Sequence, residues 1–324
     1  RNFWFILEQF GASPITHKSY LFEREHSLEK YNANDLFLPY ATSLRMSDVG
    51  YQSNIQDSLK ISYNNLDEFI NALVKGIKTP VKKFNDIGMF DDAGIAQQIS
   101  TGILQIENEL YDIVRPKRSG PSGSRPASLL KTGGIEYLEL RGIDVNPFIP
   151  EGIDVSKIKL LDIYITHSLI SESPLISDKE IEEIKANQKI MVSKGRLKNV
   201  KLSKNGDLIS LAELRKNFLA ELEQTAEALD EYSEGYLKAF HLEINKNMLL
   251  SEKILAEMDV KGFEFQEYAL NQSKKIAENF DSSDISDFYA LTNSAQASIE
   301  NLRNLEESSS MDINKYVELY NSKI

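Results

Sequence analysis

The sequence predicts an α+β protein, in which an antiparallel sheet carries the polar residues of interest and a largely helical region follows it. Segments with strand-like alternation lie within the first 150 residues, whereas helical spacing of apolar residues dominates from about residue 156 onward. The chain has 324 residues, of which 41% are hydrophobic and 27% charged, as in ordinary globular proteins with a sizeable core. We therefore expect a sheet-containing region at 1–205 and a helical region at 206–324 that packs on it.

Residues 65–78 predict the first well-defined amphipathic helix. Their apolar residues recur with the 3.6-residue period, Asn65 is suited to cap the start, and Pro80 stops the helix. Residues 103–114 alternate and predict a strand. The stretch 119–128 is rich in Gly, Ser and Pro, so it should form no regular element.

A second strand is expected at 134–142, and the turn after it contains Asp144, Asn146 and Pro147. We expect Asp144 and Asn146 to fix this turn rather than to contact a substrate, because short polar side chains bond readily to nearby backbone. Residue 146 precedes a proline, which favours an extended or turn conformation and ends the strand.

Helices account for most of the remaining chain. Ser156–Ile170 is apolar on most sides and should be buried. Ser177 and Ser210 each precede a Glu by three residues, the spacing of a capping box, in which the side chains satisfy orphan amides at a helix start. Residues 233–305 predict further helices with acidic outer faces.

Charge and composition exclude several classes of protein. The 37 basic and 49 acidic residues give a formal charge of −12, which argues against binding to nucleic acid or to an anionic membrane. The chain has no cysteine, so disulfides and thiolate metal sites are excluded. Arg1–Leu7 is too short for a secretory signal and predicts a helix on a core. Because no initiator Met precedes this apolar segment, we expect the chain to be a piece of a longer one.

Two features of the sequence suggest a site that binds a metal, a phosphate or a carboxylate. Glu139 and Arg141 lie two positions apart and therefore share one face of the second strand. A carboxylate suits a hard divalent cation, and an arginine can hold a phosphate or carboxylate through two parallel hydrogen bonds. The alternative is a cross-strand ion pair on a solvated sheet face.

The second feature is a basic segment, residues 113–134, which contains five cations and no acidic residue. Cations beside a Gly-rich loop suit a triphosphate, and such a loop can close over a nucleotide as a lid. The alternative is a solvated basic loop. The segment lacks the Gly-Lys-Ser/Thr ending of a Walker P-loop. Its cations are Arg115, Lys117, Arg118, Arg125 and Lys131.

Three segments in fixed order carry a resemblance to a known family. They are Leu38–Tyr51, Leu104–Arg118 and Glu136–Arg141, with Phe10–Pro14 upstream. Together they resemble the glutamate–cysteine ligase family, specifically the bacterial type made as a separate single-function chain. The resemblance covers nearly the whole chain, closely over residues 36–150 and loosely after about 200.

The resemblance implies a glutamine-synthetase-like ligase fold and an ATP-dependent, ADP-forming ligase. The implied reaction joins the γ-carboxyl group of L-glutamate to the amine of L-cysteine through a γ-glutamyl phosphate, the first step of glutathione biosynthesis. Mg²⁺ or Mn²⁺ would be needed, because metal ions neutralise the repulsion between an anionic nucleophile and a triphosphate. The implied protein is a cytoplasmic monomer. Residues 1–205 would be the C-terminal part of its catalytic domain.

Family roles transfer to individual residues. Glu139 matches a metal ligand, and Arg141 matches the catalytic arginine that stabilises the transferring phosphoryl group. Arg45, Tyr51 and Tyr111 match positions around the amino-acid substrates, chiefly the cysteine pocket.

Other charged residues near the motifs have weaker assignments. We expect Arg115, Lys117 and Arg118 to bind the nucleotide. Glu107 is a further acidic candidate that would act behind the residues contacting substrate.

The match also has a gap. Family members carry a substantial portion before the segment that corresponds to Arg1, and it supplies most metal-binding acids. Glu139 alone cannot hold the cations, so we expect this chain by itself to be inactive. Two alternatives stay open: a non-catalytic relative that acts as a binding or regulatory subunit, and a related carboxylate–amine ligase with another amine acceptor.

Overall fold

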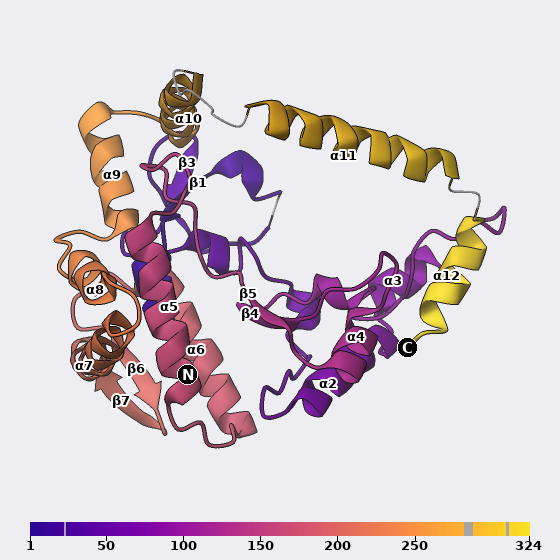
Figure 1. The fold of residues 1–324 in the computed structure, drawn as a ribbon, viewed down its shortest axis with the longest axis horizontal. Helices are drawn as coiled ribbons and strands as arrows, with labels where there is room; N and C mark the ends of the chain where they lie inside the picture. The colour runs from indigo at the N-terminus through magenta and orange to yellow at the C-terminus, as the bar shows by residue number, and fades with distance from the viewer. Residues whose placement is uncertain (23, 282–287, 309–310) are drawn as a thin grey trace. The chain divides into compact units, whose positions relative to one another are not determined.

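The computed structural model describes residues 1–22, 24–281, 288–308 and 311–324. Its backbone forms two compact units, each built from segments that are distant in sequence (Figure 1). Unit 1 combines Arg1–Ser53 with Leu140–Ala277, and unit 2 combines Asn54–Glu139 with Glu278–Ile324. These units describe compactness, so the expected division into 1–205 and 206–324 stays a prediction.

Unit 1 contains small antiparallel sheets and most of the helices. In its three-stranded sheet the order is β1-β3-β2, and Ile15 of β1 pairs with Phe37 of β3. A hairpin, β6–β7, forms the second sheet. The elements of unit 1 are α1 (Phe3–Phe10), β1 (Ile15–His17), β2 (Glu29–Lys30), β3 (Asp35–Phe37), α5 (Val155–Ile170), α6 (Asp178–Lys194), β6 (Lys201–Lys204), β7 (Asp207–Ser210), α7 (Leu211–Asp230), α8 (Tyr236–Ile244), α9 (Leu250–Lys261) and α10 (Phe265–Asp281), the last extending past Ala277.

The first helix forms the centre of the unit 1 core. Every residue of α1 is buried, and its aromatic side chains pack against those of α5 and α7. The ring centroid of Phe5 lies 5.4 Å from that of Phe218 and 6.0 Å from that of Tyr164. Burial of such rings contributes large apolar areas, so α1 anchors the residues that follow it directly, including Ser13.

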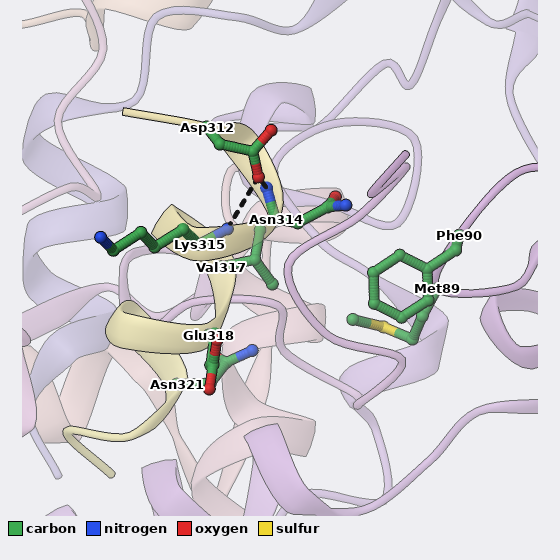
Figure 2. Close-up of a pocket in the computed structure, with 8 residues that line it drawn as sticks. All are labelled: Met89, Phe90, Asp312, Asn314, Lys315, Val317, Glu318 and Asn321. Carbon is green, nitrogen blue, oxygen red and sulfur yellow. Dashed lines mark hydrogen bonds between the residues drawn. The ribbon is translucent and has the colours of Figure 1, made fainter. Parts of the chain in front are cut away.

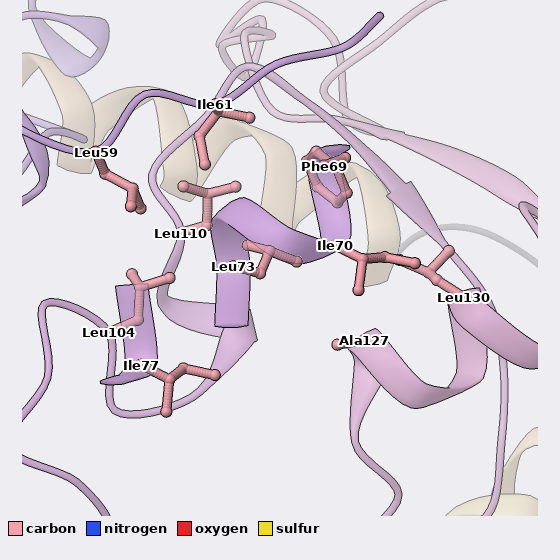
Figure 3. Close-up of a cluster of buried hydrophobic side chains, with 10 residues drawn as sticks. All are labelled: Leu59, Ile61, Phe69, Ile70, Leu73, Ile77, Leu104, Leu110, Ala127 and Leu130. Atoms are coloured by element: carbon pink, nitrogen blue, oxygen red, sulfur yellow. The ribbon is translucent and has the colours of Figure 1, made fainter. Parts of the chain in front are cut away.

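Unit 2 contains a cluster of buried apolar side chains from two of its helices and the loops beside them. Its elements are α2 (Leu66–Lys78), α3 (Lys82–Ile87), β4 (Val114–Lys117), α4 (Pro126–Gly133), β5 (Tyr137–Leu140), α11 (Phe288–Ser308) and α12 (Ile313–Asn321), and the unit boundary falls inside β5. Helices α2 and α4 pack together, and β4 pairs with β5. Figure 3 shows the apolar side chains between them: Leu59, Ile61, Phe69, Ile70, Leu73, Ile77, Leu104, Leu110, Ala127 and Leu130.

Several sequence-based expectations are confirmed. The Asn65 side chain accepts a hydrogen bond from the Glu68 amide at the start of α2, as expected of a cap. Ser177 and Ser210 cap α6 and α7 in the same way. The α+β class with small antiparallel sheets also agrees with the prediction. Among the described residues, no helix combines the length and apolar character that crossing a membrane requires.

The strand expected at 103–114 is wrong. Residues Glu107–Glu109 form a 3-10 turn, and strand β4 begins only at Val114. The reason is local satisfaction of the backbone: the Glu109 carboxylate accepts the Gln105 amide at 2.7 Å, and Arg115 donates to nearby carbonyl groups. With these groups bonded inside the segment, no neighbouring strand is required.

Two other expectations need correction. The stretch 119–128 is irregular only up to residue 125, because Pro126 starts α4, a position that a proline's fixed φ favours. Helix α5 is buried on one face only, where Leu160 and Ile163 lie. Its end is exposed, with Leu169 at 83% exposure, so apolar composition overstated the burial of this helix.

Candidate functional site

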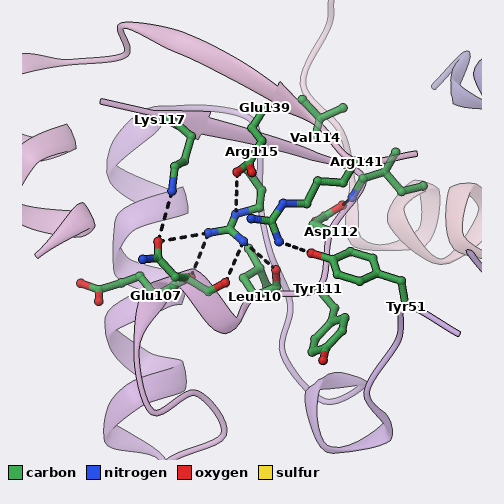
Figure 4. A network of polar contacts seen from close by, with 12 residues as sticks. Tyr51, Glu107, Leu110, Tyr111, Asp112, Val114, Arg115, Lys117, Glu139 and Arg141 are labelled. Atoms are coloured by element: carbon green, nitrogen blue, oxygen red, sulfur yellow. Dashed lines mark hydrogen bonds and ion pairs between the residues drawn. The ribbon is translucent and has the colours of Figure 1, made fainter. Parts of the chain in front are cut away.

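In unit 1 the structure brings together three of the residues that the sequence selected. Arg141 follows directly after β5, and its guanidinium donates a hydrogen bond to the Tyr51 hydroxyl (Figure 4). The guanidinium carbon of Arg141 also lies 5.7 Å from the centre of the Tyr51 ring. This contact holds the guanidinium in one orientation, and Arg141 stays partly exposed.

Arg45, the third of these residues, is turned toward the backbone beside Arg141. Its terminal Nη2 donates to the carbonyl oxygens of Arg141 and Ile143, at 2.7 and 2.9 Å. Its Nε donates to Asp144 Oδ1 at 2.5 Å. Any contact of Arg45 with a substrate carboxylate must therefore use its other terminal nitrogen or displace one of these partners.

In unit 2 Arg115 is buried and binds the backbone. Its guanidinium donates to the carbonyl oxygens of Asn108 and Leu110, at 2.9 and 3.2 Å (Figure 4). The side chain is 4% exposed, and its Nε lies 4.0 Å from a Glu139 carboxylate oxygen. Arg115 thus fixes the 107–110 turn, and the nucleotide role expected for it stays a prediction.

Glu107 and Arg125 form a buried ion pair in unit 2. The Arg125 Nε donates to Glu107 Oε1 at 3.1 Å, and both side chains are at most 1% exposed. The Arg125 guanidinium also stacks on the Tyr320 ring of α12, 4.2 Å from its centre. Burial raises the pKa of Tyr320 even though the Arg125 cation opposes this effect. The pair therefore joins the 107–110 turn, the start of α4 and α12.

The other predicted nucleotide ligands lie at the surface of unit 2. Lys117 donates to the Asn108 side-chain oxygen at 3.1 Å. Arg118 donates to the Gly133 carbonyl oxygen at 2.5 Å, at the end of α4. Arg118 also donates to the Gly134 carbonyl oxygen at 3.3 Å. Both side chains remain partly exposed, so they can reach a ligand by exchanging surface partners.

Glu139, the predicted metal ligand, is 34% exposed and lies beside Arg115. Among the described residues, no three His, Asp or Glu side chains gather closely enough to hold a metal ion. The described residues therefore do not by themselves form a complete site for Mg²⁺ or Mn²⁺. The role of Glu139 as one ligand stays a prediction.

Tyr111 lies next to the 107–110 turn and is 44% exposed. Its backbone amide donates to the Gln56 side chain at 2.9 Å, which fixes the main chain while the ring projects outward. An exposed aromatic ring is compatible with a wall of a substrate pocket, and this role stays a prediction.

A shallow cleft of about 670 Å³ also lies in unit 2, against α12 (Figure 2). None of its lining residues was singled out from the sequence, so it adds nothing to the predicted site. The lining residues are Met89, Phe90, Asp312, Asn314, Lys315, Val317, Glu318 and Asn321.

Two features of the site were not visible in the sequence. Asp144 was expected only to fix a turn, but it is buried and accepts hydrogen bonds from Ser13 and Arg45, 131 and 99 positions away. Arg125 was counted only among five cations that would suit a triphosphate, with a solvated basic loop as the alternative, whereas it pairs with Glu107. No spacing rule connects such partners, because the contacts join irregular segments rather than one helix or strand. Asn146 does fix its turn, since it accepts the Phe148 amide.

Comparison with solved structures defines the class of fold. A crystal structure of glutamate–cysteine ligase from Francisella tularensis in complex with AMP superposes with a TM-score of 0.89 at 27% identity, over 98% of this chain and 64% of that one. A bifunctional glutathione synthetase from Pasteurella multocida shares the fold more distantly, with a TM-score of 0.54 at 18% identity over 86% of this chain and 30% of that one. The fold is therefore that of a glutamate–cysteine ligase.

Sequence comparisons agree. The family model described as glutamate–cysteine ligase matches residues 1–191. Glutamate–cysteine ligase of Pseudomonas putida KT2440 is 36% identical over the whole chain, which covers 64% of that protein. The enzyme of Alcanivorax borkumensis is 36% identical over 86% of the chain and 56% of that protein. The chain belongs to the glutamate–cysteine ligase family. It spans about 64% of the length of the first of these relatives.

Proposed function

We propose that the protein containing this chain is an ATP-dependent ligase that joins the γ-carboxyl group of L-glutamate to the amine of L-cysteine. The observation that carries this proposal is the match of the whole chain to relatives named glutamate–cysteine ligase. The Francisella structure that shares the fold was solved in complex with AMP, which supports an adenine nucleotide as a ligand. The product would enter glutathione biosynthesis.

The chemistry proceeds in two steps. A γ-carboxylate oxygen of glutamate attacks the γ-phosphorus of ATP, and ADP leaves, so that an acyl phosphate forms. The cysteine amine then attacks the acyl carbon, loses a proton, and expels inorganic phosphate. Negative charge spreads over the transferring phosphoryl oxygens in the first step, and a preorganised arginine stabilises this charge without reorganisation.

Arg141 is the residue that suits this task. Its planar guanidinium can donate two parallel hydrogen bonds to phosphoryl oxygens, which a lysine cannot do. The Tyr51 hydroxyl accepts from the same guanidinium and so restricts its rotation. The other assignments belong to the same proposal: Arg45, Tyr51 and Tyr111 at the amino-acid substrates, Arg115, Lys117 and Arg118 at the nucleotide, and Glu139 at Mg²⁺ or Mn²⁺. A cytoplasmic, monomeric enzyme remains part of it.

The test measures ADP release by the intact protein with both amino acids and with each omitted. We expect release to require glutamate and cysteine together, and mass spectrometry to detect γ-glutamylcysteine. Release that responds to another amine but not to cysteine would assign a related carboxylate–amine ligase. No release with any amine, while the protein still binds a partner, would support the non-catalytic alternative.

A further inference from the structure

We propose that Asp144 is a positioning residue for the reaction: it holds Arg45, and through Arg45 it fixes the main chain of Arg141. This inference rests on the proposed function, in which Arg141 stabilises the transferring phosphoryl group. Asp144 itself would contact neither substrate nor nucleotide. All residues in the argument belong to unit 1.

Both oxygens of the Asp144 carboxylate accept hydrogen bonds from other residues of unit 1. The residue is 6% exposed. One oxygen, Oδ2, accepts from the Ala12 amide at 2.8 Å and from the Ser13 hydroxyl at 2.7 Å. The other oxygen, Oδ1, accepts from Arg45 Nε at 2.5 Å. Hydrogen bonds to an ionised acceptor are short and roughly twice as strong as neutral ones, so Asp144 ties Arg45 to the segment that follows the buried helix α1.

Arg45 transmits this constraint to the main chain that carries Arg141. One terminal nitrogen donates to the carbonyl oxygens of Arg141 and Ile143, at 2.7 and 2.9 Å. Strand β5 ends at Leu140, so residues 141–144 lie outside the strand; the Asp144 amide donates to the Phe10 carbonyl oxygen at 3.2 Å, which fixes the far end of this segment. The Arg45 guanidinium supplies the fixation that a neighbouring strand would provide inside a sheet.

The same loop also holds the other end of Arg141. Tyr51, whose hydroxyl accepts from the Arg141 guanidinium, is anchored to Arg45 because its amide donates to the Arg45 carbonyl oxygen at 2.5 Å. Gly50 makes this close approach possible, since a Cβ at position 50 would lie 2.1 Å from that same oxygen. Arg141 is therefore held at its carbonyl by Arg45 and at its guanidinium by Tyr51, and Asp144 neutralises and orients the arginine that connects them.

Loss of this support should appear in turnover rather than in ground-state binding. A displacement of about 1 Å in a group that acts in the transition state can cost roughly 100-fold in rate. We expect Asp144→Asn in the intact protein to lower kcat by about 10- to 100-fold, and to change the KM for ATP and for glutamate by less than about threefold. A rise in the KM for cysteine with normal kcat would instead mean that Asp144 serves substrate binding by Arg45, and would overturn the proposal.

A double-mutant cycle separates positioning from general damage. If Asp144 acts through Arg141, then Asp144→Asn should cause little further loss of kcat in an Arg141→Ala background. If Asp144→Asn lowered kcat by the same factor in the wild-type and in the Arg141→Ala background, the proposal would be overturned. The matched control is Glu8→Gln, because Glu8 is also a buried carboxylate that pairs with a half-exposed arginine, Arg215. The side chains of Glu8 and Arg215 are 1% and 39% exposed, and those of Asp144 and Arg45 are 4% and 38% exposed. We expect this control to lower Tm and leave kcat unchanged.

If Asp144→Asn does not fold, Ser13→Ala takes its place in the same cycle. The Ser13 hydroxyl donates to Asp144 and accepts the Arg45 amide at 3.2 Å, so its removal weakens the same support by a smaller amount. A normal kcat in Ser13→Ala would then overturn the inference. Absence of γ-glutamylcysteine synthesis by the wild-type protein would overturn the proposed function and this inference with it, whereas normal turnover of Asp144→Asn would overturn the inference alone.

Discussion

The two units use arginine in opposite ways. In unit 1 Arg141 is partly exposed, and a tyrosine hydroxyl and a neighbouring arginine hold it at both ends. In unit 2 Arg115 and Arg125 are almost completely buried and bond to backbone carbonyls and to Glu107. Arg141 and Arg115 both lie within motifs that resemble ligase motifs, and Arg125 lies in the basic segment between two of them. The difference teaches that a basic residue in a functional motif can serve the fold, and that exposure and partners decide which role it has.

The largest expected effect on stability concerns the buried pair of unit 2. Arg125→Met should lower the unfolding free energy by about 3–5 kcal/mol, because it leaves the Glu107 carboxylate buried without its cation. Urea unfolding measures this loss. The Arg125→Met substitution should also increase hydrogen exchange in α12, because Tyr320 loses the stacked guanidinium. The control is the double variant Glu107→Leu with Arg125→Met, which should recover much of the stability, and a loss below about 1 kcal/mol in the single variant would contradict a structural role.

The next prediction compares the loss of stability and of kcat when one arginine of each unit is replaced. Arg115→Met should cost about 2–3 kcal/mol, because it leaves the partly buried carbonyl group of Asn108 and the buried one of Leu110 without their donor. Arg141→Met should cost less than about 1 kcal/mol but lower kcat by roughly 100-fold or more. Thermal unfolding and ADP release measure both variants. If Arg115→Met raised the KM for ATP without loss of Tm, Arg115 would contact the nucleotide and the contrast between the units would fail.

The sequence predicted those features that depend on local patterns. Helix α2 followed from its apolar period and from Asn65, and the caps at Ser177 and Ser210 followed from their spacing to a glutamate. These signals work because all the partners lie within one helical turn. The roles expected for Arg45 and Arg141 came from motifs that occur in the same order as in a known family, and not from a physical argument about these residues.

The partners of the charged residues could not be predicted. Alternation at 103–114 suggested a strand, but Arg115 and Glu109 satisfy that backbone locally and leave a turn. The pairing of Glu107 with Arg125, like that of Asp144 with Arg45, joins irregular segments whose approach depends on the packing of distant helices. Neither the period of apolar residues nor motif spacing contains that information, and so Arg125 was counted only among the cations of the basic segment and Asp144 was assigned only a turn.

A smaller effect concerns the buried ion pair of unit 1, in which Glu243 of α8 meets Lys157 of α5 at 3.1 Å. Burial opposes ionisation of Glu243, but Lys157 and hydrogen bonds from Lys246 and Ser156 outweigh it, so the pKa of Glu243 is lowered from its ordinary 4.5. A lowered pKa in the folded state means that the stabilisation is present above about pH 4.5 and is lost as pH falls through the folded value.

Hydrogen exchange in α5 and α8 should therefore increase as the pH is lowered from 6 toward 3, after correction for the intrinsic exchange rate. The matched variant is Glu243→Gln, which cannot titrate, so its exchange should be faster at pH 6 and should change less with acid. Equal pH dependence in the wild type and in Glu243→Gln would show that this carboxylate does not contribute to the acid sensitivity of unit 1.

The smallest expected effect on stability concerns the exposed cations of unit 2, and it decides which of them serve the nucleotide. Lys117 and Arg118 each have weak surface partners, so alanine at either position should change the unfolding free energy by less than about 1 kcal/mol. If they bind the triphosphate of ATP, the KM for ATP should rise by about fivefold or more, and the KM for glutamate should not change. The matched control is Lys131→Ala, because Lys131 is an exposed cation of the same basic segment that was not assigned to the nucleotide. An unchanged KM for ATP in both variants would mean that the basic loop is only solvated, and that unit 2 contributes its arginines to the fold alone.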